Sequence, residues 1–211
     1  MLAYRTIRQA GEHEIEIKKS RFICQAKRVF SEEEAQDFIQ EINKKHWKAT
    51  HNCVAFQIGE HNQIQRALDD GEPSGTAGVP MLEVLKQMDL KNIIVIVTRY
   101  FGGTKLGAGG LVRAYSHAVS EALQAIGIVE RQVQQELAVR VDYPLTGPME
   151  HWIENSPYQL LDTTYLADVC YHLGVAEDQV TACQEAITNL SSGQASFELG
   201  DKVYVDVPVE A

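Results

Sequence analysis

A run of aliphatic residues, Ile93–Val97, lies near the middle of the 211-residue chain and continues into Thr98. Strands buried on both faces have continuous β-branched sequences, whereas strands with one solvent-exposed face alternate apolar and polar residues. The run therefore predicts a central strand over Ile93–Thr98, covered on both sides. It is much shorter than the ~18 apolar residues that a membrane span requires. Because no apolar segment follows Met1–Arg5 either, we expect no export signal and a cytoplasmic protein.

The segments before this run alternate between strand and helix patterns. Strands are predicted where apolar and polar residues alternate, at Glu12–Ile17, Arg21–Cys24, Cys53–Ile58 and Gln63–Leu68. The segment Ser31–Glu34 has the composition of a capping box and predicts a helix that ends near His46. A second helix is expected over Thr76–Met88, because Pro80 falls in its first turn, where proline is tolerated.

The net charge of −10 is unevenly distributed: residues 1–133 carry +1 and residues 134–211 carry −11. This asymmetry indicates two domains with different partners. After Glu130 the order strand–helix–strand–strand–helix–strand is typical of the split βαβ, or ferredoxin-like, fold. We therefore predict an α+β protein with domains over residues 1–130 and 135–211. We expect the acidic second domain to offer a surface for protein contacts.

The segment Arg99–Gly110 joins the central strand to a helix predicted from Leu111 to Gly127. Its glycines allow close approach to the backbone, and the N–H groups at the start of the helix attract anions. Lys105 and Arg113 are placed to contact the same anion. The residues that we predict to bind an anion or RNA are Arg99, Tyr100, Phe101, Gly102, Gly103, Lys105, Gly107, Gly109 and Arg113. The alternative is a tight corner without a ligand, in which Arg99 pairs with a local acid.

Two known phosphate-binding motifs do not fit this segment. A Walker A loop requires lysine after its last glycine, where Ala108 follows Gly107, and a dinucleotide-binding fingerprint requires a small residue at Val112. Phosphate binding is therefore predicted from geometry and not from a motif.

The loop Asp69–Thr76 is the second candidate. The residues that we expect on its surface are Asp69, Asp70, Glu72, Ser74 and Thr76. Its three carboxylates are able to hold Mg²⁺, but they are also able to cap the helix that follows. We expect the structural role, with no metal and no cofactor.

Nucleophilic catalysis has less support. His51, Cys53 and Ser74 are the residue types of a catalytic triad, but the chain contains no Gly-x-Ser-x-Gly elbow. The cysteines form no C-x-x-C pair, so we expect reduced, buried thiols instead of disulfides or a zinc site. We predict no catalytic residue and favour a protein that is not an enzyme.

Two motifs resemble the IMPACT family: Asp69–Gly78 (Asp-Asp-Gly-Glu-Pro-Ser-Gly-Thr-Ala-Gly) and Val97–Gly107 (Val-Thr-Arg-Tyr-Phe-Gly-Gly-Thr-Lys-Leu-Gly). The resemblance covers about residues 10–125, and the acidic second half is similar to the layout of bacterial, YigZ-type members. It implies that the first domain has the fold of the second domain of ribosomal protein S5. It also implies that the second domain is similar to ferredoxin-like modules of ribosomal translocation factors. Eukaryotic members regulate translation, so the resemblance implies a translation context; it establishes no catalytic residues.

These observations favour a non-catalytic, translation-associated regulator that binds RNA or the ribosome through its first domain. The expected partners are RNA, the ribosome or translation factors, and no membrane. The alternative is a small-molecule phosphotransfer enzyme, because Lys105–Gly110 loosely resembles the phosphate loop of GHMP kinases. The Ser-Ser pair that follows the glycines in those kinases is absent, since Leu111 and Val112 stand there.

Overall fold

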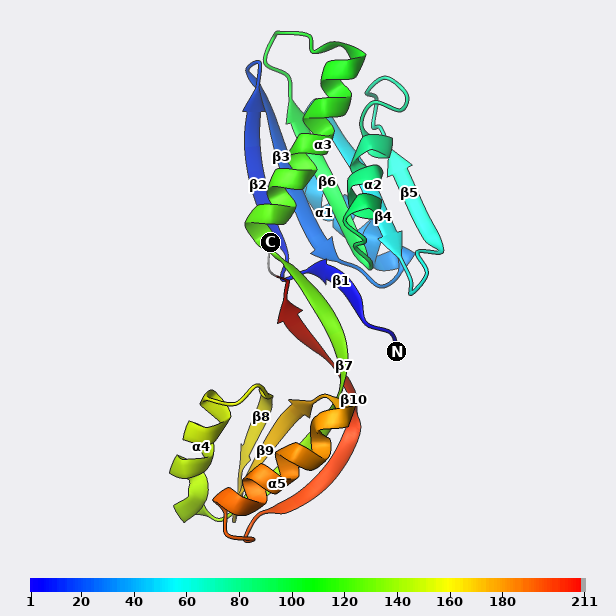
Figure 1. Cartoon of the computed structure of the whole chain (residues 1–211). Helices are drawn as coiled ribbons and strands as arrows, with labels where there is room; N and C mark the ends of the chain where they lie inside the picture. The colour runs from blue at the N-terminus through cyan, green and yellow to red at the C-terminus, as the bar shows by residue number, and fades with distance from the viewer. Residues whose placement is uncertain (210–211) are drawn as a thin grey trace. The chain divides into compact units, whose positions relative to one another are not determined.

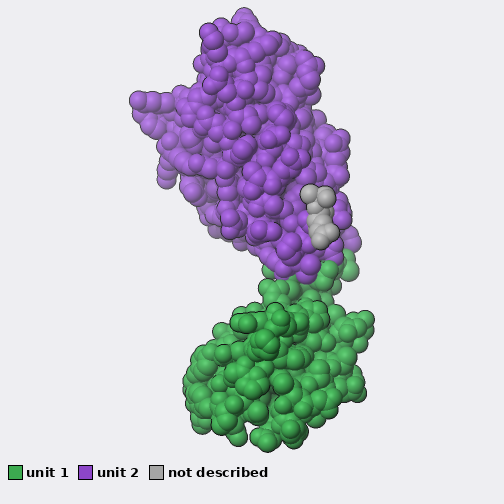
Figure 2. All heavy atoms as spheres, turned by 60° about the vertical axis from the view of Figure 1, so that its left-hand side comes forward, with its two compact units in different colours: residues 1–3, 131–205 green, residues 4–130, 206–211 purple. Residues whose placement is uncertain are grey.

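The computed structural model describes residues 1–209, which form two compact units (Figure 2). Unit 2 comprises Tyr4–Glu130 and the end of the chain from Asp206, and unit 1 comprises Met1–Ala3 and Arg131–Val205. Each unit thus includes a short segment from the opposite end of the chain. Residues 210–211 of the predicted second domain lie outside the described residues.

Unit 2 is built on an antiparallel sheet with helices on both faces (Figure 1). The strands lie in the order β2 (Gly11–Ile17), β3 (Ser20–Arg28), β6 (Ile93–Tyr100), β4 (His51–Ile58) and β5 (Ile64–Leu68). One face is covered by α1 (Glu32–Lys45), and the other by α2 (Gly78–Gln87) and α3 (Gly107–Ile126).

The central position of β6 confirms the prediction made from its aliphatic run. Ile94 and Ile96 pack in the cluster that contains Phe38 of α1. Val95 and Val97 pack on the opposite face, in the cluster that α2 and α3 complete. A strand between two apolar layers has no solvent face, which is why its sequence does not alternate.

The predicted capping box is also confirmed. Ser31 Oγ accepts a hydrogen bond from the backbone N–H of Glu34 over 3.1 Å, and the Glu34 carboxylate accepts one from the N–H of Phe30 over 2.9 Å. These bonds satisfy backbone donors that the first turn of a helix leaves free.

The boundaries around the glycine-rich segment differ from the prediction. β6 continues through Arg99 and Tyr100, because both residues pair with β3 and Arg99 also pairs with β4. Helix α3 begins at Gly107, several residues before the expected Leu111. The connecting loop is therefore residues 101–106, and Gly109 lies in the first turn of a helix.

Unit 1 has the element order that the sequence pattern predicted. Its elements are β7 (Ile128–Val141), α4 (Thr146–Glu154), β8 (Gln159–Tyr165), β9 (Val169–Val175), α5 (Val180–Leu190) and β10 (Ser196–Pro208), with short 3-10 turns at Tyr143–Leu145 and Glu177–Gln179. The first residues of β7 and the last residues of β10 belong to unit 2. β7 pairs with β9 and β10, and β8 pairs with β9. β7 also pairs with β1 (Tyr4–Ile7), a strand that the sequence did not predict.

The core of unit 1 lies between one face of this sheet and its two helices. Val139 and Leu173 from the strands contact the same cluster as Ile153 of α4 and Ile187 of α5. The chain is therefore an α+β protein in both units. Within residues 1–209, no helix has the length and apolar character needed to cross a membrane.

Candidate functional site

A buried ion pair lies at the end of β6, beneath α3. The side chains of Arg99 and Glu72 are 7% and 3% exposed, and Arg99 Nη1 lies 2.6 Å from Glu72 Oε1. Tyr115 of α3 donates its hydroxyl to the same oxygen over 2.7 Å. Burial, with Cys53 and Glu72 nearby, raises the pKa of Tyr115 well above its usual value, so Tyr115 keeps the proton that it donates. Glu72 Oε1 therefore receives two donors.

The other oxygen of Glu72 faces a histidine of β4. His51 Nε2 lies 3.6 Å from Glu72 Oε2, which has no hydrogen-bond donor among residues 1–209. His51 Nδ1 lies 2.7 Å from the carbonyl oxygen of Asp70. Because a carbonyl oxygen only accepts, Nδ1 carries the hydrogen, and Nε2 is an acceptor in the neutral ring. In that form of the ring, two acceptor atoms lie 3.6 Å apart.

The Asp69 carboxylate holds the loop that precedes α2. It accepts backbone N–H groups of Gly78 and Gly75 at 2.9 Å and of Ala77 at 3.2 Å. Burial raises the pKa of Asp69, but these three donors outweigh burial and hold the pKa below its usual value. Asp70 Oδ2 accepts the N–H of Asn52 over 2.6 Å. Both carboxylates are engaged in shaping the loop, and within residues 1–209 no group of three His, Cys, Asp or Glu side chains is placed to hold a metal ion.

Two of the five residues expected on the surface of this loop are instead buried. Glu72 is 8% exposed because it pairs with Arg99, and Thr76 is 6% exposed. The Thr76 hydroxyl donates to the carbonyl of Pro73 over 2.6 Å, which closes the turn before α2. Asp70 and Ser74 are exposed, as predicted, and Asp69 is half-buried.

The glycine-rich loop lies against the turn between β2 and β3. A Cβ atom at Gly102 would lie 2.0 Å from the backbone carbonyl of Lys19, so only glycine fits at this position. The N–H of Gly102 donates to Ser20 Oγ over 3.1 Å. This close approach places the exposed side chains of Lys18 and Lys19 on the turn beside the loop that carries Lys105. Spacing along the sequence does not show that this turn joins the candidate site.

Two cavities meet at Leu106. The first, which we call the Glu72 cavity, has a volume of about 400 Å³. Its polar lining is Thr50, His51, Glu72, Arg99 and Lys105, and its apolar lining is Pro73, Phe101, Leu106, Leu111 and the first residues of α3, Gly107 and Ala108. The second, the Arg113 cavity, has a volume of about 260 Å³ and is lined by Ile17, Lys18, Leu106, Gly110, Arg113, Ala114 and His117.

The structure changes the roles of several predicted anion ligands. Arg99 is buried and its charge is balanced by Glu72, which matches the alternative of a local ion pair and not the predicted surface contact. Tyr100 lies in β6, where its hydroxyl is 2.9 Å from His46 Nδ1. Lys105 and Arg113 line different cavities, and both cavities include Leu106 in their lining. Phe101 is 48% exposed and lines the Glu72 cavity.

Four exposed cations surround the loop: Lys18, Lys19, Lys105 and Arg113. We call them the basic surface. Within residues 1–209, none of the four has a carboxylate partner. The free N–H groups at the start of α3 add partial positive charge between them. This part of an otherwise acidic chain therefore attracts anions.

Cys53 contributes no nucleophile. Burial raises the pKa of its thiol to about 12, and its Sγ donates to the carbonyl of Asp69 over 3.0 Å. Because the thiolate is the reactive form, a thiol with such a pKa is inert near neutral pH. All four cysteines are free and buried.

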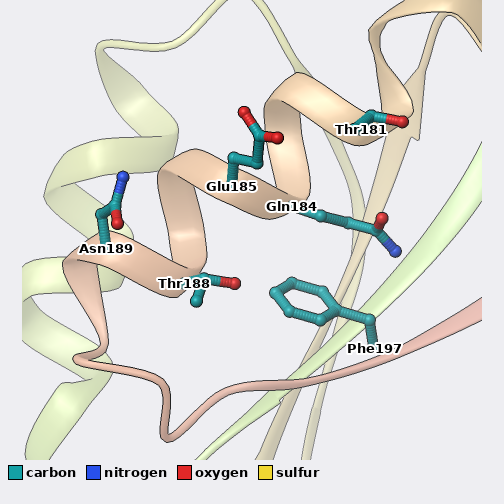
Figure 3. Close-up of a pocket in the computed structure, with 6 residues that line it drawn as sticks. All are labelled: Thr181, Gln184, Glu185, Thr188, Asn189 and Phe197. Atoms are coloured by element: carbon teal, nitrogen blue, oxygen red, sulfur yellow. The ribbon is translucent and has the colours of Figure 1, made fainter.

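Unit 1 contains a cavity of about 470 Å³ between α5 and β10. Figure 3 shows Gln184 and Thr188 on the side of α5 that faces the Phe197 ring, whereas Glu185 projects away from the ring. This cavity is lined by amide, hydroxyl and carboxylate groups, and no cation of the described residues lines it. An anion is therefore attracted to unit 2 and not to this cavity.

Comparisons with known proteins agree with the two-part architecture. The family model described as the Impact N-terminal domain matches residues 18–123, which include the lining of the Glu72 cavity and the four cations of the basic surface. A second model, described as a domain of unknown function (DUF1949), matches residues 139–194.

The relatives are similar over most of the chain. The IMPACT family member YvyE of Bacillus subtilis is 50% identical over 98% of this chain and 95% of its own length. The IMPACT family member YigZ of Escherichia coli is 32% identical over 84% of this chain and 88% of its own. A solved structure described as a hypothetical protein is 30% identical, with a TM-score of 0.60 over 93% of this chain and 97% of its own. The chain thus belongs to the IMPACT family, in its bacterial YigZ-type form.

Proposed function

We propose that this protein is a non-catalytic, translation-associated regulator and that unit 2 binds RNA phosphates, on the ribosome or in free RNA. The observation that carries the proposal is the basic surface. Its four unpaired cations lie around the start of α3 in a chain whose net charge is −10. No carboxylate within residues 1–209 pairs with these cations, and they lie next to a helix N-terminus, so they are available to bind phosphate.

The two cavities on either side of Leu106 suit a polyanion better than an isolated ion. Lys105 belongs to one cavity, and Lys18 with Arg113 to the other. An RNA strand presents a regular series of phosphates, so it can occupy both places at once. Each additional phosphate contact adds to affinity by releasing counterions.

Two fold relationships support a translation context. The resemblance implies that unit 2 has the fold of the second domain of ribosomal protein S5. The element order and strand pairing of unit 1 are compatible with the ferredoxin-like modules of translocation factors. Its acidic surface disfavours RNA, and we propose that it contacts protein. The phosphotransfer alternative has no support, since no relative described above is named as a kinase.

The test is co-sedimentation with ribosomal particles in a sucrose gradient at low salt, repeated up to ~0.5 M salt. We expect binding at low salt and release at high salt. The double variant Lys105→Gln/Arg113→Gln removes one cation from each cavity, and both side chains are exposed, so the fold is expected to persist. The log–log salt slope should become shallower by ~0.7–0.9 for each phosphate that the variant no longer binds.

Lys44→Gln is the matched control. Lys44 is an exposed lysine of the same unit, but it lies on α1, on the opposite face of the sheet. It should leave the salt slope unchanged. A protein that stays free of ribosomal particles and of RNA at every salt concentration would contradict the proposed function.

A further inference from the structure

The Glu72 cavity has features that phosphate binding alone does not explain. Much of its lining is apolar, with Phe101, Leu106 and Leu111 as its larger side chains. A bound phosphate gains nothing from these groups, because it remains hydrated. An apolar cavity with a few convergent polar groups is typical of a site for a small organic moiety. Phe101, which is 48% exposed, contributes an aromatic ring to this lining, and the Arg99 guanidinium carbon lies 5.6 Å from the centroid of that ring.

The polar end of the cavity presents acceptors. Glu72 Oε1 is occupied by Arg99 and Tyr115, at 2.6 Å and 2.7 Å. Glu72 Oε2 and His51 Nε2 lie 3.6 Å apart, and neither receives a hydrogen within residues 1–209 when the histidine is neutral. His51 and Glu72 both line the cavity, so their acceptor atoms are within reach of a ligand that enters it. A ligand with two adjacent N–H groups would satisfy both atoms.

The charge around the acceptors limits the class of that ligand. A guanidinium or ammonium group also has adjacent N–H donors, but Lys105 and the start of α3 line the same cavity and repel a cation, whereas the charges of Arg99 and Glu72 balance each other. A neutral, planar donor attached to an anion fits better. Guanine has this pattern, because its N1–H and N2–H₂ are adjacent donors and its nucleotide carries a phosphate. Adenine and inosine lack the pair, since adenine N1 is an acceptor and inosine has no 2-amino group.

We propose that the Glu72 cavity receives one guanine base of the RNA. The base stacks on Phe101, its N1–H and N2–H₂ donate to Glu72 Oε2 and His51 Nε2, and its phosphate lies near Lys105 and the N-terminus of α3. This proposal rests on the proposed function and adds base selectivity to it. Base recognition of this kind, by stacking and by bonds to the Watson–Crick edge, is how proteins read unpaired RNA.

The test is calorimetric titration of the full chain with GMP, IMP and AMP. The three nucleotides carry the same phosphate and ribose and differ only in their base. We expect GMP to bind at least about tenfold more tightly than IMP or AMP, because each of these lacks a donor for one of the two acceptors. Equal affinities for the three would refute guanine recognition and leave phosphate binding intact.

A variant pair separates the base contact from the phosphate contact. Phe101→Ala removes the stacking face, and Phe30→Ala removes a phenylalanine of similar exposure, 51% against 48%. We expect Phe101→Ala to weaken GMP binding about fivefold or more and Phe30→Ala to leave it unchanged. His51→Ala should bring the affinities for GMP and IMP together, and circular dichroism checks that each variant is folded.

Two further results would overturn the inference. One is binding of arginine amide that competes with GMP, which would show that the cavity takes a cationic peptide group. The other is the absence of GMP binding at millimolar concentration. In either case, ribosome co-sedimentation and its salt slope still report on the basic surface separately.

Discussion

The buried pair of Glu72 and Arg99 makes the stability of unit 2 depend on one carboxylate. In the variant Glu72→Gln, the amide retains the shape of the side chain, but Arg99 keeps its charge at 7% side-chain exposure without a counter-ion. Removing one member of a buried pair destabilises a protein by about 3–5 kcal/mol. The exposed pair Glu14–Arg21, with side chains 43% and 48% exposed, is the control. Glu14→Gln should cost at most about 1 kcal/mol.

Hydrogen exchange is the suitable assay, because the chain has two units and a single unfolding transition is not assured. Amides of β4 and β6 report the opening of unit 2 alone. A destabilisation of about 3–5 kcal/mol corresponds to at least about a hundredfold faster exchange of these amides, at about 1.4 kcal/mol per factor of ten. In the double variant Glu72→Gln/Arg99→Met, most of this stability should be recovered, because no unpaired charge remains buried.

One contradicting result is that Glu72→Gln accelerates exchange no more than Glu14→Gln does. Another is that the double variant is less stable than Glu72→Gln alone. Either result would mean that water or rearrangement compensates the charge of Arg99, and that the pair is not desolvated as its exposure indicates.

Three other predictions concern the same unit. Asp69→Asn/Asp70→Asn should lower thermal stability in Mg²⁺-free buffer; an effect seen only with Mg²⁺ present would indicate a metal site instead. The folded-state pKa of Asp69 is held below its usual value, so the contribution of this carboxylate to folding stability is complete above the unfolded-state pKa of ~4. That contribution disappears as the pH falls through the folded-state pKa. The melting temperatures of the variant and the parent should therefore converge in acid. Gly102→Ala should destabilise unit 2 more than Gly103→Ala does. A Cβ atom at Gly102 would lie 2.0 Å from the Lys19 backbone, whereas a Cβ atom at Gly103 would meet nothing within 4 Å and only the positive φ of 88° opposes the substitution. Equal melting temperatures of the two variants would contradict this prediction. Cys53, with a thiol pKa of about 12, should react with iodoacetamide near neutral pH only after unfolding, as peptide mass spectrometry can show.

The sequence predicted those parts of the fold whose signal is local. The aliphatic run placed β6 at the centre of its sheet, and the Ser31–Glu34 pattern located the start of α1. The start of α3 was missed because glycine disfavours helices, yet Gly107 and Gly109 occupy its exposed first turn. Helix boundaries of this kind depend on tertiary contacts, which the helix propensities of the individual residues do not reflect.

The candidate site was predicted in part for the same reason. The two segments that resemble family motifs, Asp69–Gly78 and Val97–Gly107, line one cavity. The spacing of residues along the sequence does not show which side chains of the two segments contact each other. Glu72 and Arg99 meet because β6 continues past Thr98 and brings Arg99 under α3. Tyr115 has the apolar spacing of α3, and only the structure shows that its hydroxyl donates to Glu72. The Lys18–Lys19 turn joins the site through the backbone contact at Gly102.

The exchange of chain ends between the units has a consequence for synthesis on the ribosome. Asp206, near the C-terminus, forms an ion pair with Arg28 of β3 over 2.6 Å, and Val209 donates its N–H to the carbonyl of Ile128 over 3.2 Å. These contacts belong to unit 2, most of which is synthesised first. Unit 2 therefore completes these contacts only after residues 206–209 have left the exit tunnel. A nascent chain that stops at Glu130 leaves Arg28 without this partner, so premature termination yields a less stable product than the same residues have in the full chain.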